Sequence, residues 1–199
     1  MKLLHDHADV HLSFVRLPGE LQLVIHADAS FCSEDEKRSR GAFVAMLASR
    51  QLSDDGSSMA NVWDWSSSRI KRMCRSTLGA ELITTGAATD SADWLAVIAL
   101  ELGLLVKTSQ DAWPVPIVVN DARSVTSTVM KCTSPKEKNL LIDLKKLRQR
   151  SAENSIDFGW VSTGHMVADS LTKYVAKPIA LLRCLVENKI VARGRGSES

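Results

Sequence analysis

The chain has 199 residues, of which 45% are hydrophobic, and it carries a formal net charge of +2. This length suffices for one domain with a core and is short for two, and the hydrophobic content excludes a disordered chain. A nearly balanced net charge indicates no particular partner, so the information lies in how the charges are distributed along the chain.

The four cysteines stand far apart, at positions 32, 74, 132 and 184, with no CxxC pair and no zinc-type spacing. This pattern favours reduced thiols in an intracellular protein. The chain does not open with a signal-peptide pattern, and no apolar run approaches the roughly 20 residues of a membrane span. We therefore expect an intracellular protein of the cytoplasm or nucleus that has no membrane partner.

The first half of the chain predicts an antiparallel meander. Residues 1–20 form a lead-in segment, in which Val10–Val15 is a candidate edge strand. Leu21–Asp28 alternates apolar and polar residues, and Gly41–Ala48 is a nearly continuous apolar run of the kind that central strands contain. Asn61–Ser66 is a third candidate strand, and short loops between the three favour hairpin connections.

The second half predicts helices and two further strands. A long helix is expected from Ser76, the candidate N-cap, to about Leu102. The remaining elements are a strand over Val115–Asn120, helices over Asp121–Met130 and Glu137–Ala152, a strand over residues 156–160, and helices over 166–175 and about Pro178–Asn188. Trp63, Trp65, Trp94 and Trp160 fall at core-like positions, where we expect them to pack.

Together these elements predict an α/β fold with a five-stranded mixed sheet, three antiparallel strands plus two parallel ones, flanked by helices. The expected domain covers residues 21–176. Residues 177–199 are expected to contain the last helix and a Gly/Ser-rich, disordered tail.

Four acidic residues stand where such a fold would bring them together. Asp28 and Asp121 end strands, Glu81 lies in the first turns of the long helix, and Asp169 lies near the start of a late helix. Ligand sites of open α/β sheets lie beyond the carboxyl ends of the strands. Each acid alone is ordinarily a helix cap or a loop residue, but four at matching places indicate a site for Mg²⁺ or Mn²⁺, which prefer oxygen ligands. Two such ions can hydrolyse a phosphodiester without a protein nucleophile.

Six short segments, in this order and spacing, resemble the ribonuclease H domain at the end of copia-type retrotransposon polyproteins. They read His26-Ala27-Asp28-Ala29-Ser30, Trp65 to Arg72, Arg75 to Glu81, Asn120-Asp121-Ala122-Arg123-Ser124, Leu141-Ile142-Asp143-Leu144 and Val161 to Lys173. The resemblance implies a ribonuclease H-like fold and hydrolysis of the RNA strand of an RNA–DNA hybrid with two Mg²⁺ ions, Mn²⁺ being an alternative. It also implies a reverse transcriptase upstream in a parent polyprotein.

By this resemblance, the four metal-binding carboxylates are Asp28, Glu81, Asp121 and Asp169. Cellular ribonucleases H carry a mobile histidine shortly before the last acid, and His165 stands four residues before Asp169. His165 is therefore a candidate for proton transfer or product release, and an ordinary loop histidine is the alternative.

Two basic stretches are candidates for contact with a nucleic-acid backbone. Arg69, Lys71, Arg72 and Arg75 form a run without an intervening acid just before Glu81, and we favour substrate binding there over a solvated face. Basic residues also dominate the predicted helix over Glu137–Ala152, where a second backbone contact and a basic solvent-facing side are both open.

Three functions compete. The first is an active hybrid nuclease, and the second is a catalytically inactive or domesticated ribonuclease H-like module that binds nucleic acid. The third is an integrase-type strand transferase, which uses three acids. The presence of all four acids favours the first, and the helix of Glu81 comes too early in the chain for the third.

Overall fold

The computed structural model describes residues 11–32, 38–53, 57–107, 114–131, 137–173 and 178–192. Its strands are β1 (Leu21–Ser30), β2 (Arg40–Leu52), β3 (Ser58–Arg69), β4 (Ile117–Asn120), β5 (Asp157–Trp160) and β6 (Lys189–Ile190). Its helices are α2 (Thr77–Glu101), α3 (Arg123–Met130), α4 (Leu141–Ala152), α5 (Asp169–Thr172) and α6 (Ile179–Glu187), with short 3₁₀ turns η1 (Lys138–Leu140) and η2 (Thr163–His165).

The strands of these ranges form one mixed sheet in the order β5-β4-β1-β2-β3-β6. The pairs β1–β2, β2–β3 and β3–β6 are antiparallel, whereas β1–β4 and β4–β5 are parallel. The predicted meander and parallel half are thus confirmed. None of the helices in the described ranges combines the length and apolar character that a membrane crossing requires.

The predicted strand number was wrong, because the described part of the sheet has six strands rather than five. The sixth, β6, is two residues long and pairs with the edge of β3 at Ser58 and Met59. Asn188 adopts a left-handed conformation with φ of 52° just before β6, and its carbonyl accepts a hydrogen bond from the Ala60 amide at 2.7 Å. Two residues carry no alternation pattern, so the pairing of β6 depends on where α6 docks.

Most other boundaries follow the predictions with local differences, but the helix predicted over residues 166–175 is reduced to the four residues of α5 in its described part. Ser76 caps α2 as expected and accepts a hydrogen bond from the Gly79 amide at 3.1 Å. β3 extends beyond the predicted Asn61–Ser66 at both ends. No strand occurs in residues 11–20, so the edge strand expected over Val10–Val15 is absent from its described part. The Gly/Ser-rich tail expected from residue 194 lies outside the described residues.

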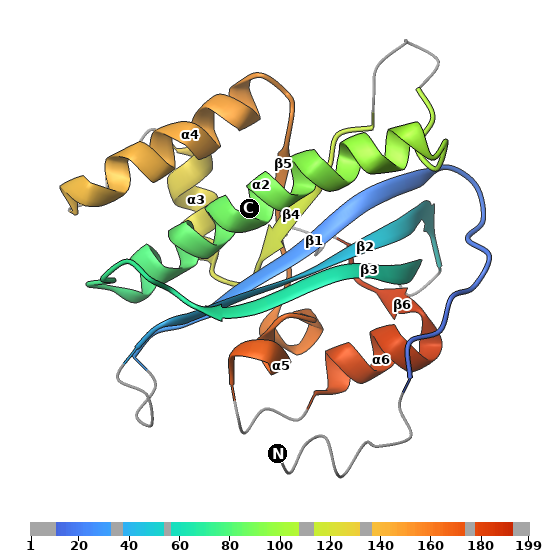
Figure 1. Cartoon of the computed structure of the whole chain (residues 1–199), viewed down its shortest axis with the longest axis horizontal. Helices are drawn as coiled ribbons and strands as arrows, with labels where there is room; N and C mark the ends of the chain where they lie inside the picture. The colour runs from blue at the N-terminus through green and yellow to red at the C-terminus, as the bar shows by residue number, and fades with distance from the viewer. Residues whose placement is uncertain are drawn as a thin grey trace.

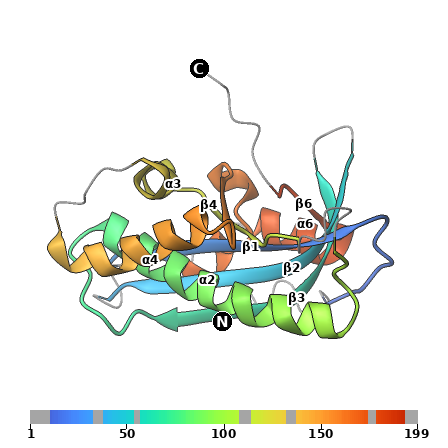
Figure 2. The ribbon, with the colours of Figure 1, turned by 90° about the horizontal axis from the view of Figure 1, so that it is seen from above.

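Helices α2, α3 and α4 lie over one face of the sheet and α5 and α6 over the other (Figure 1), and one of the two larger hydrophobic clusters fills each side. Alternate residues of β1, among them Leu23 and Ile25, pack against α2, α3 and α4, while Val24 faces the other way toward α6 and the segment before α5. Figure 2 shows α2 and α4 running side by side along the sheet, and the ion pairs Lys146–Asp90 and Arg150–Asp93 join the two helices. At Gly41 of β2, an added Cβ would collide with Thr84 Oγ1, so glycine permits the close approach that seats α2 on the sheet.

Candidate active site

Asp28 lies in β1 two residues before the strand ends, and its side chain shares the face of Val24 and His26 because side chains alternate along a strand. It is 1% exposed, and its Oδ2 accepts a hydrogen bond from Thr172 Oγ1 of α5. Burial raises the pKa of Asp28, the hydroxyl of Thr172 and the charge of Lys173 oppose that rise, and neighbouring carboxylates add to it. The environment therefore favours a nearby cation.

Glu81 projects from the second turn of α2 and is 3% exposed. Its Oε2 accepts a hydrogen bond from Asn120 Nδ2 at 2.9 Å. Burial raises the pKa of Glu81 to about 8, and the charges of Asp28 and Asp121 contribute to the rise, which the hydrogen bond from Asn120 partly offsets. Near neutral pH this carboxyl group holds a proton unless a positive charge replaces it.

Asp121 follows β4 directly, at the carboxyl end of a strand that runs parallel to β1. Thr163 Oγ1 donates to its Oδ2 at 2.8 Å, and the indole N–H of Trp160 donates to its backbone carbonyl at 2.8 Å. The side chain and the backbone of Asp121 are thus held independently by residues of β5 and the turn that follows it.

The structure brings Asp28, Glu81 and Asp121 together, with one carboxylate oxygen from each within 4.8 Å of the others. The parallel pairing of β1 and β4 places their carboxyl ends side by side, and α2 supplies the third acid from the sheet face it covers. Hard oxygen donors at this spacing, in a site where burial and mutual repulsion oppose ionisation, fit a divalent cation such as Mg²⁺ or Mn²⁺.

The fourth predicted acid, Asp169, is not a member of this three-acid group. Its Oδ1 forms an ion pair with Lys173 Nζ, although its charge still acts on Asp28. Hydrogen bonds tie its segment to β1, because Val167 N–H donates to His26 Nδ1 at 3.3 Å and Thr172 donates to Asp28. Its role as a metal ligand stays a prediction.

His165 ends η2 and is exposed. Its Nδ1 lies 2.9 Å from Ser162 Oγ, and the neighbouring Thr163 contacts Asp121. This turn therefore connects His165 to the rim of the three-acid group without making the imidazole part of it. Both readings of His165 stay open.

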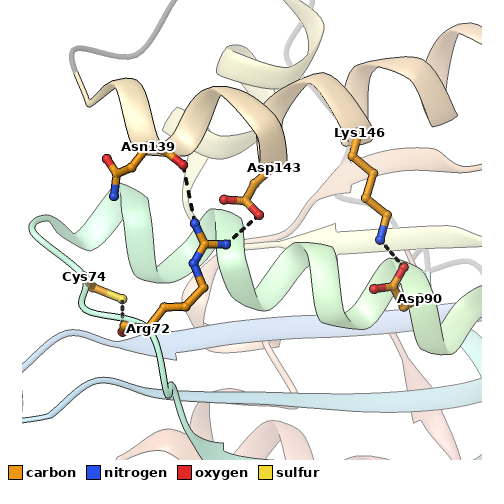
Figure 3. Close-up of polar contacts among 6 residues, drawn as sticks. All are labelled: Arg72, Cys74, Asp90, Asn139, Asp143 and Lys146. Atoms are coloured by element: carbon orange, nitrogen blue, oxygen red, sulfur yellow. Dashed lines mark hydrogen bonds and ion pairs between the residues drawn. The ribbon is translucent and has the colours of Figure 1, made fainter.

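The basic run lies where β3 leads into α2. Arg69 is the last residue of β3, and Lys71, Arg72 and Arg75 are exposed in the connection. Arg72 donates to Asp143 of α4 at 2.8 Å and to the Asn139 carbonyl at 3.4 Å (Figure 3). Arg72 thus anchors the connection to α4. A hollow of about 410 Å³ is lined by Cys32, Arg38, Ser39, Arg69, Lys71 and Arg72, among others.

The basic side chains of α4 make many contacts within the protein. Lys146 pairs with Asp90 of α2, as Figure 3 shows, and Arg150 pairs with Asp93. Arg148 donates to backbone carbonyls at the end of α3. The basic side chains of α4 therefore have a structural role, because their contacts hold α2, α3 and α4 together.

Three polar residues around these acids are not among the site residues that the sequence predicts: Asn120, Thr172 and Lys173. Asn120 immediately precedes Asp121, and strand alternation places it on the α2 face together with Val118. That position was a usable signal, because an amide beside a strand-end acid can reach the helix above. No comparable signal pointed to Thr172 or Lys173, because their partners depend on how α5 docks.

No protein-family model and no curated protein matches the sequence. Among solved structures, the chain is similar to LC11-RNase H1, isolated from compost by a metagenomic approach, with 14% identity over 75% of this chain and 91% of that chain and a TM-score of 0.50. LC11-RNase H1 in complex with an RNA/DNA hybrid matches with 15% identity over 75% and 93% of the chains and a TM-score of 0.50.

A further similarity is to an N-terminal RNase H domain from Mycobacterium tuberculosis, with 18% identity over 82% of this chain and 96% of that chain and a TM-score of 0.48. The two likenesses to LC11-RNase H1 show that this chain has a ribonuclease H-like α/β fold.

Proposed function

We propose that the protein is a metal-dependent ribonuclease H that hydrolyses the RNA strand of RNA–DNA hybrids. The observation that carries this proposal is the convergence of Asp28, Glu81 and Asp121 within 4.8 Å at the carboxyl ends of β1 and β4 in a ribonuclease H-like fold. The hybrid bound to LC11-RNase H1 supports the choice of substrate.

In this proposal, Asp28, Glu81 and Asp121 hold the metal, and Asp169 is the candidate for a further carboxylate ligand. Two bound divalent ions would supply an activated water and stabilisation of the leaving oxygen of the phosphodiester. The protein contributes rigidity, since Thr172 orients Asp28, Asn120 orients Glu81 and Thr163 orients Asp121. His165 remains a candidate for proton transfer or product release.

The basic run supports a nucleic-acid substrate. Arg69 and Lys71 line the hollow next to the connection into α2, the helix that carries Glu81. Cations on such a surface neutralise phosphates and release counterions, which gives affinity without sequence preference. We assign Arg72 a mixed role, because its guanidinium group already contacts Asp143.

We further propose that the chain derives from the ribonuclease H domain of a copia-type retrotransposon polyprotein, with a reverse transcriptase upstream in the parent chain. The support is the order and spacing of the motifs from His26 to Lys173. An intracellular location, in the cytoplasm or nucleus, agrees with this origin and with the dispersed cysteines.

The test is a cleavage assay with the purified full chain. A labelled RNA–DNA hybrid, duplex RNA and duplex DNA are each incubated with Mg²⁺, with Mn²⁺ and with EDTA. We expect cleavage of the RNA strand of the hybrid alone, and only with metal. Hybrid binding without cleavage under every metal condition would instead support the catalytically inactive, nucleic-acid-binding module.

A further inference from the structure

Lys173 supplies a positive charge beside the carboxylates. Its Nζ pairs with Asp169 Oδ1, and the side chain of Asp169 is 15% exposed while that of Lys173 is 45% exposed. The two residues have the i,i+4 spacing of a helical ion pair, but α5 ends at Thr172 and Lys173 is extended, with φ of −123° and ψ of 130°. The lysine therefore reaches Asp169 from beyond the helix.

The negative charges of the neighbouring carboxylates also act on the ammonium group of Lys173. Desolvation lowers the pKa of Lys173, but its hydrogen bond to Asp169 and the charges of Asp28, Asp169 and Asp121 outweigh that effect and raise the pKa overall. In turn, Lys173 opposes the rise in the pKa of Asp28. Lys173 thus interacts electrostatically with two acids of the three-acid group and directly with the fourth acid.

We infer that Lys173 is a resident cation that takes the place of one divalent ion by occupying Asp169 until metal or substrate displaces it. This inference rests on the proposed function, because it treats Asp169 as a metal ligand whose carboxylate is occupied by Lys173 in the metal-free protein. The group of Asp28, Glu81 and Asp121 then receives the first ion. Asp169 becomes available only when its ion pair with Lys173 opens.

Two physical points support this order of events. An ammonium ion and a divalent cation compete for the same carboxylate oxygen, so the ion pair must weaken metal binding at Asp169. Asp169 is mostly buried, but the side chain of Lys173 is 45% exposed, so water and a competing cation can reach the pair from the lysine side. Because the side chain of Lys173 already lies partly in solvent, a divalent ion can displace it, and it is then a mobile cation next to the site.

The inference is tested by calorimetric titration of the full chain with Mn²⁺ alone, without nucleic acid. Lys173→Met removes the charge and keeps most of the side-chain length. Lys131→Met is the matched control, since Lys131 is exposed at the end of α3 and its loss changes the net charge equally. We expect Lys173→Met to bind Mn²⁺ about tenfold more tightly than the parent or to bind an additional ion, and Lys131→Met to bind like the parent.

The double variant Asp169→Asn/Lys173→Met identifies the carboxylate involved. Compared with Asp169→Asn alone, it should show no tightening, because the ligand that Lys173 occupies is gone. Lys173→Gln serves as a second charge-removing variant if the methionine variant melts early. Unchanged or weaker Mn²⁺ binding by the charge-removing variants, or tightening that persists without Asp169, would overturn the inference.

Hybrid cleavage by the parent separates this inference from the proposed function. Cleavage combined with unchanged Mn²⁺ binding in Lys173→Met would reject the inference alone. Tighter Mn²⁺ binding without cleavage by any variant would support the resident cation and reject the nuclease. Absence of Mn²⁺ binding in the parent and in Lys173→Met would reject both.

Discussion

Asn120 donates a hydrogen bond from its Nδ2 to Glu81 Oε2 at 2.9 Å, and both side chains are buried. The same Nδ2 donates to the Ala27 carbonyl of β1 at 3.1 Å, and Asn120 Oδ1 accepts from the Ala122 amide at 2.6 Å. One amide side chain therefore links α2, β1 and the turn that carries Asp121. It positions the acids without itself belonging to the three-acid group.

Asn120→Ala should lower both stability and metal affinity. It leaves the Ala27 carbonyl, Glu81 and the Ala122 amide without their partner, and an unmet buried polar group costs about 1–3 kcal/mol. Metal affinity should fall roughly tenfold or more, as when outer partners of metal ligands are removed. Chemical denaturation in the presence of EDTA measures the loss of stability, and titration with Mn²⁺ measures the loss of metal affinity.

Asn61→Ala is the matched control for Asn120. Asn61 exchanges hydrogen bonds with Val15 and is part of β3, outside the group of acids. We expect this control to lose stability and keep the Mn²⁺ affinity of the parent. Equal Mn²⁺ affinities in Asn120→Ala and Asn61→Ala would show that Asn120 is only a structural residue.

The raised pKa of Glu81 predicts how stability depends on pH in the metal-free protein. The folded-state pKa is about 8, above the ordinary value of 4.5, so the folded state holds a proton that the unfolded state releases between these values. The contribution of this group is fully present below about pH 4.5 and is lost as the pH rises through 8. The glutamine of Glu81→Gln does not ionise, so this variant does not lose stability in that way. Its free energy of unfolding, relative to that of the parent, should therefore increase from pH 5 to pH 9 in EDTA.

The same group predicts proton release on metal binding. Below pH 8 the metal must displace the Glu81 proton, so the apparent Mg²⁺ affinity of the parent should rise with pH and level off above 8. Calorimetry in two buffers of different ionisation enthalpy counts the protons released. Glu81→Gln should bind Mg²⁺ weakly at every pH, and a pH-independent affinity in the parent would contradict the role of Glu81.

Asp121→Asn should separate catalysis from folding. Asparagine can accept the hydrogen bond from Thr163, and the bond from Trp160 goes to the backbone, so both contacts survive. With less repulsion among the acids, the metal-free variant should melt no lower than the parent. Metal affinity should fall by at least about tenfold, and hydrolysis should fall with it.

Asp64→Asn is the control for Asp121, because Asp64 lies in β3 and accepts a hydrogen bond from the Trp65 amide. This variant should cleave the hybrid as fast as the parent. If Asp121→Asn also cleaved at the parental rate, Asp121 would have only a structural role, such as its contact with Thr163, and the proposed mechanism would be wrong.

Replacing Lys71 and replacing Arg72 should affect different properties of the protein, although the two residues are neighbours in the chain. Lys71→Ala should weaken hybrid binding and reduce the slope of log affinity against log salt by about 0.9 for a lost phosphate contact. Arg72→Ala should mainly lower the melting temperature, because Arg72 joins the connection to α4 through Asp143. Hybrid binding at several salt concentrations and melting curves distinguish the two, and an unchanged slope in Lys71→Ala would make Lys71 a solvated residue.

Local patterns in the sequence predicted most of the architecture. Alternation in residues 21–28, the Ser76 cap and the apolar spacing of the helices are set by residues close in the chain, and each appears in the structure at nearly the expected place. The three converging acids were equally predictable. Asp28 and Asp121 follow from strand ends, and Glu81 follows from its place in the first turns of α2.

The tertiary structure decided the features that depend on contacts between distant segments. Local pattern did not indicate the pairing of β6 or the ion pair between Arg72 and Asp143. It was contradicted by the exposure of Trp65 and Trp94, which are 58% and 67% exposed. The packing expected for these two tryptophans was wrong, because a helical or strand pattern does not reveal which face finds a partner.

The contacts that position the acids of the site also depend on segments that are distant in the chain. Sequence by itself determined which acidic residues stand at strand and helix ends, because that depends on short-range periodicity. Only the fold decided that Asn120 holds Glu81 and that Asp169 pairs with Lys173, because a hydrogen bond or ion pair is set by distances of a few ångströms between elements that packing alone brings together.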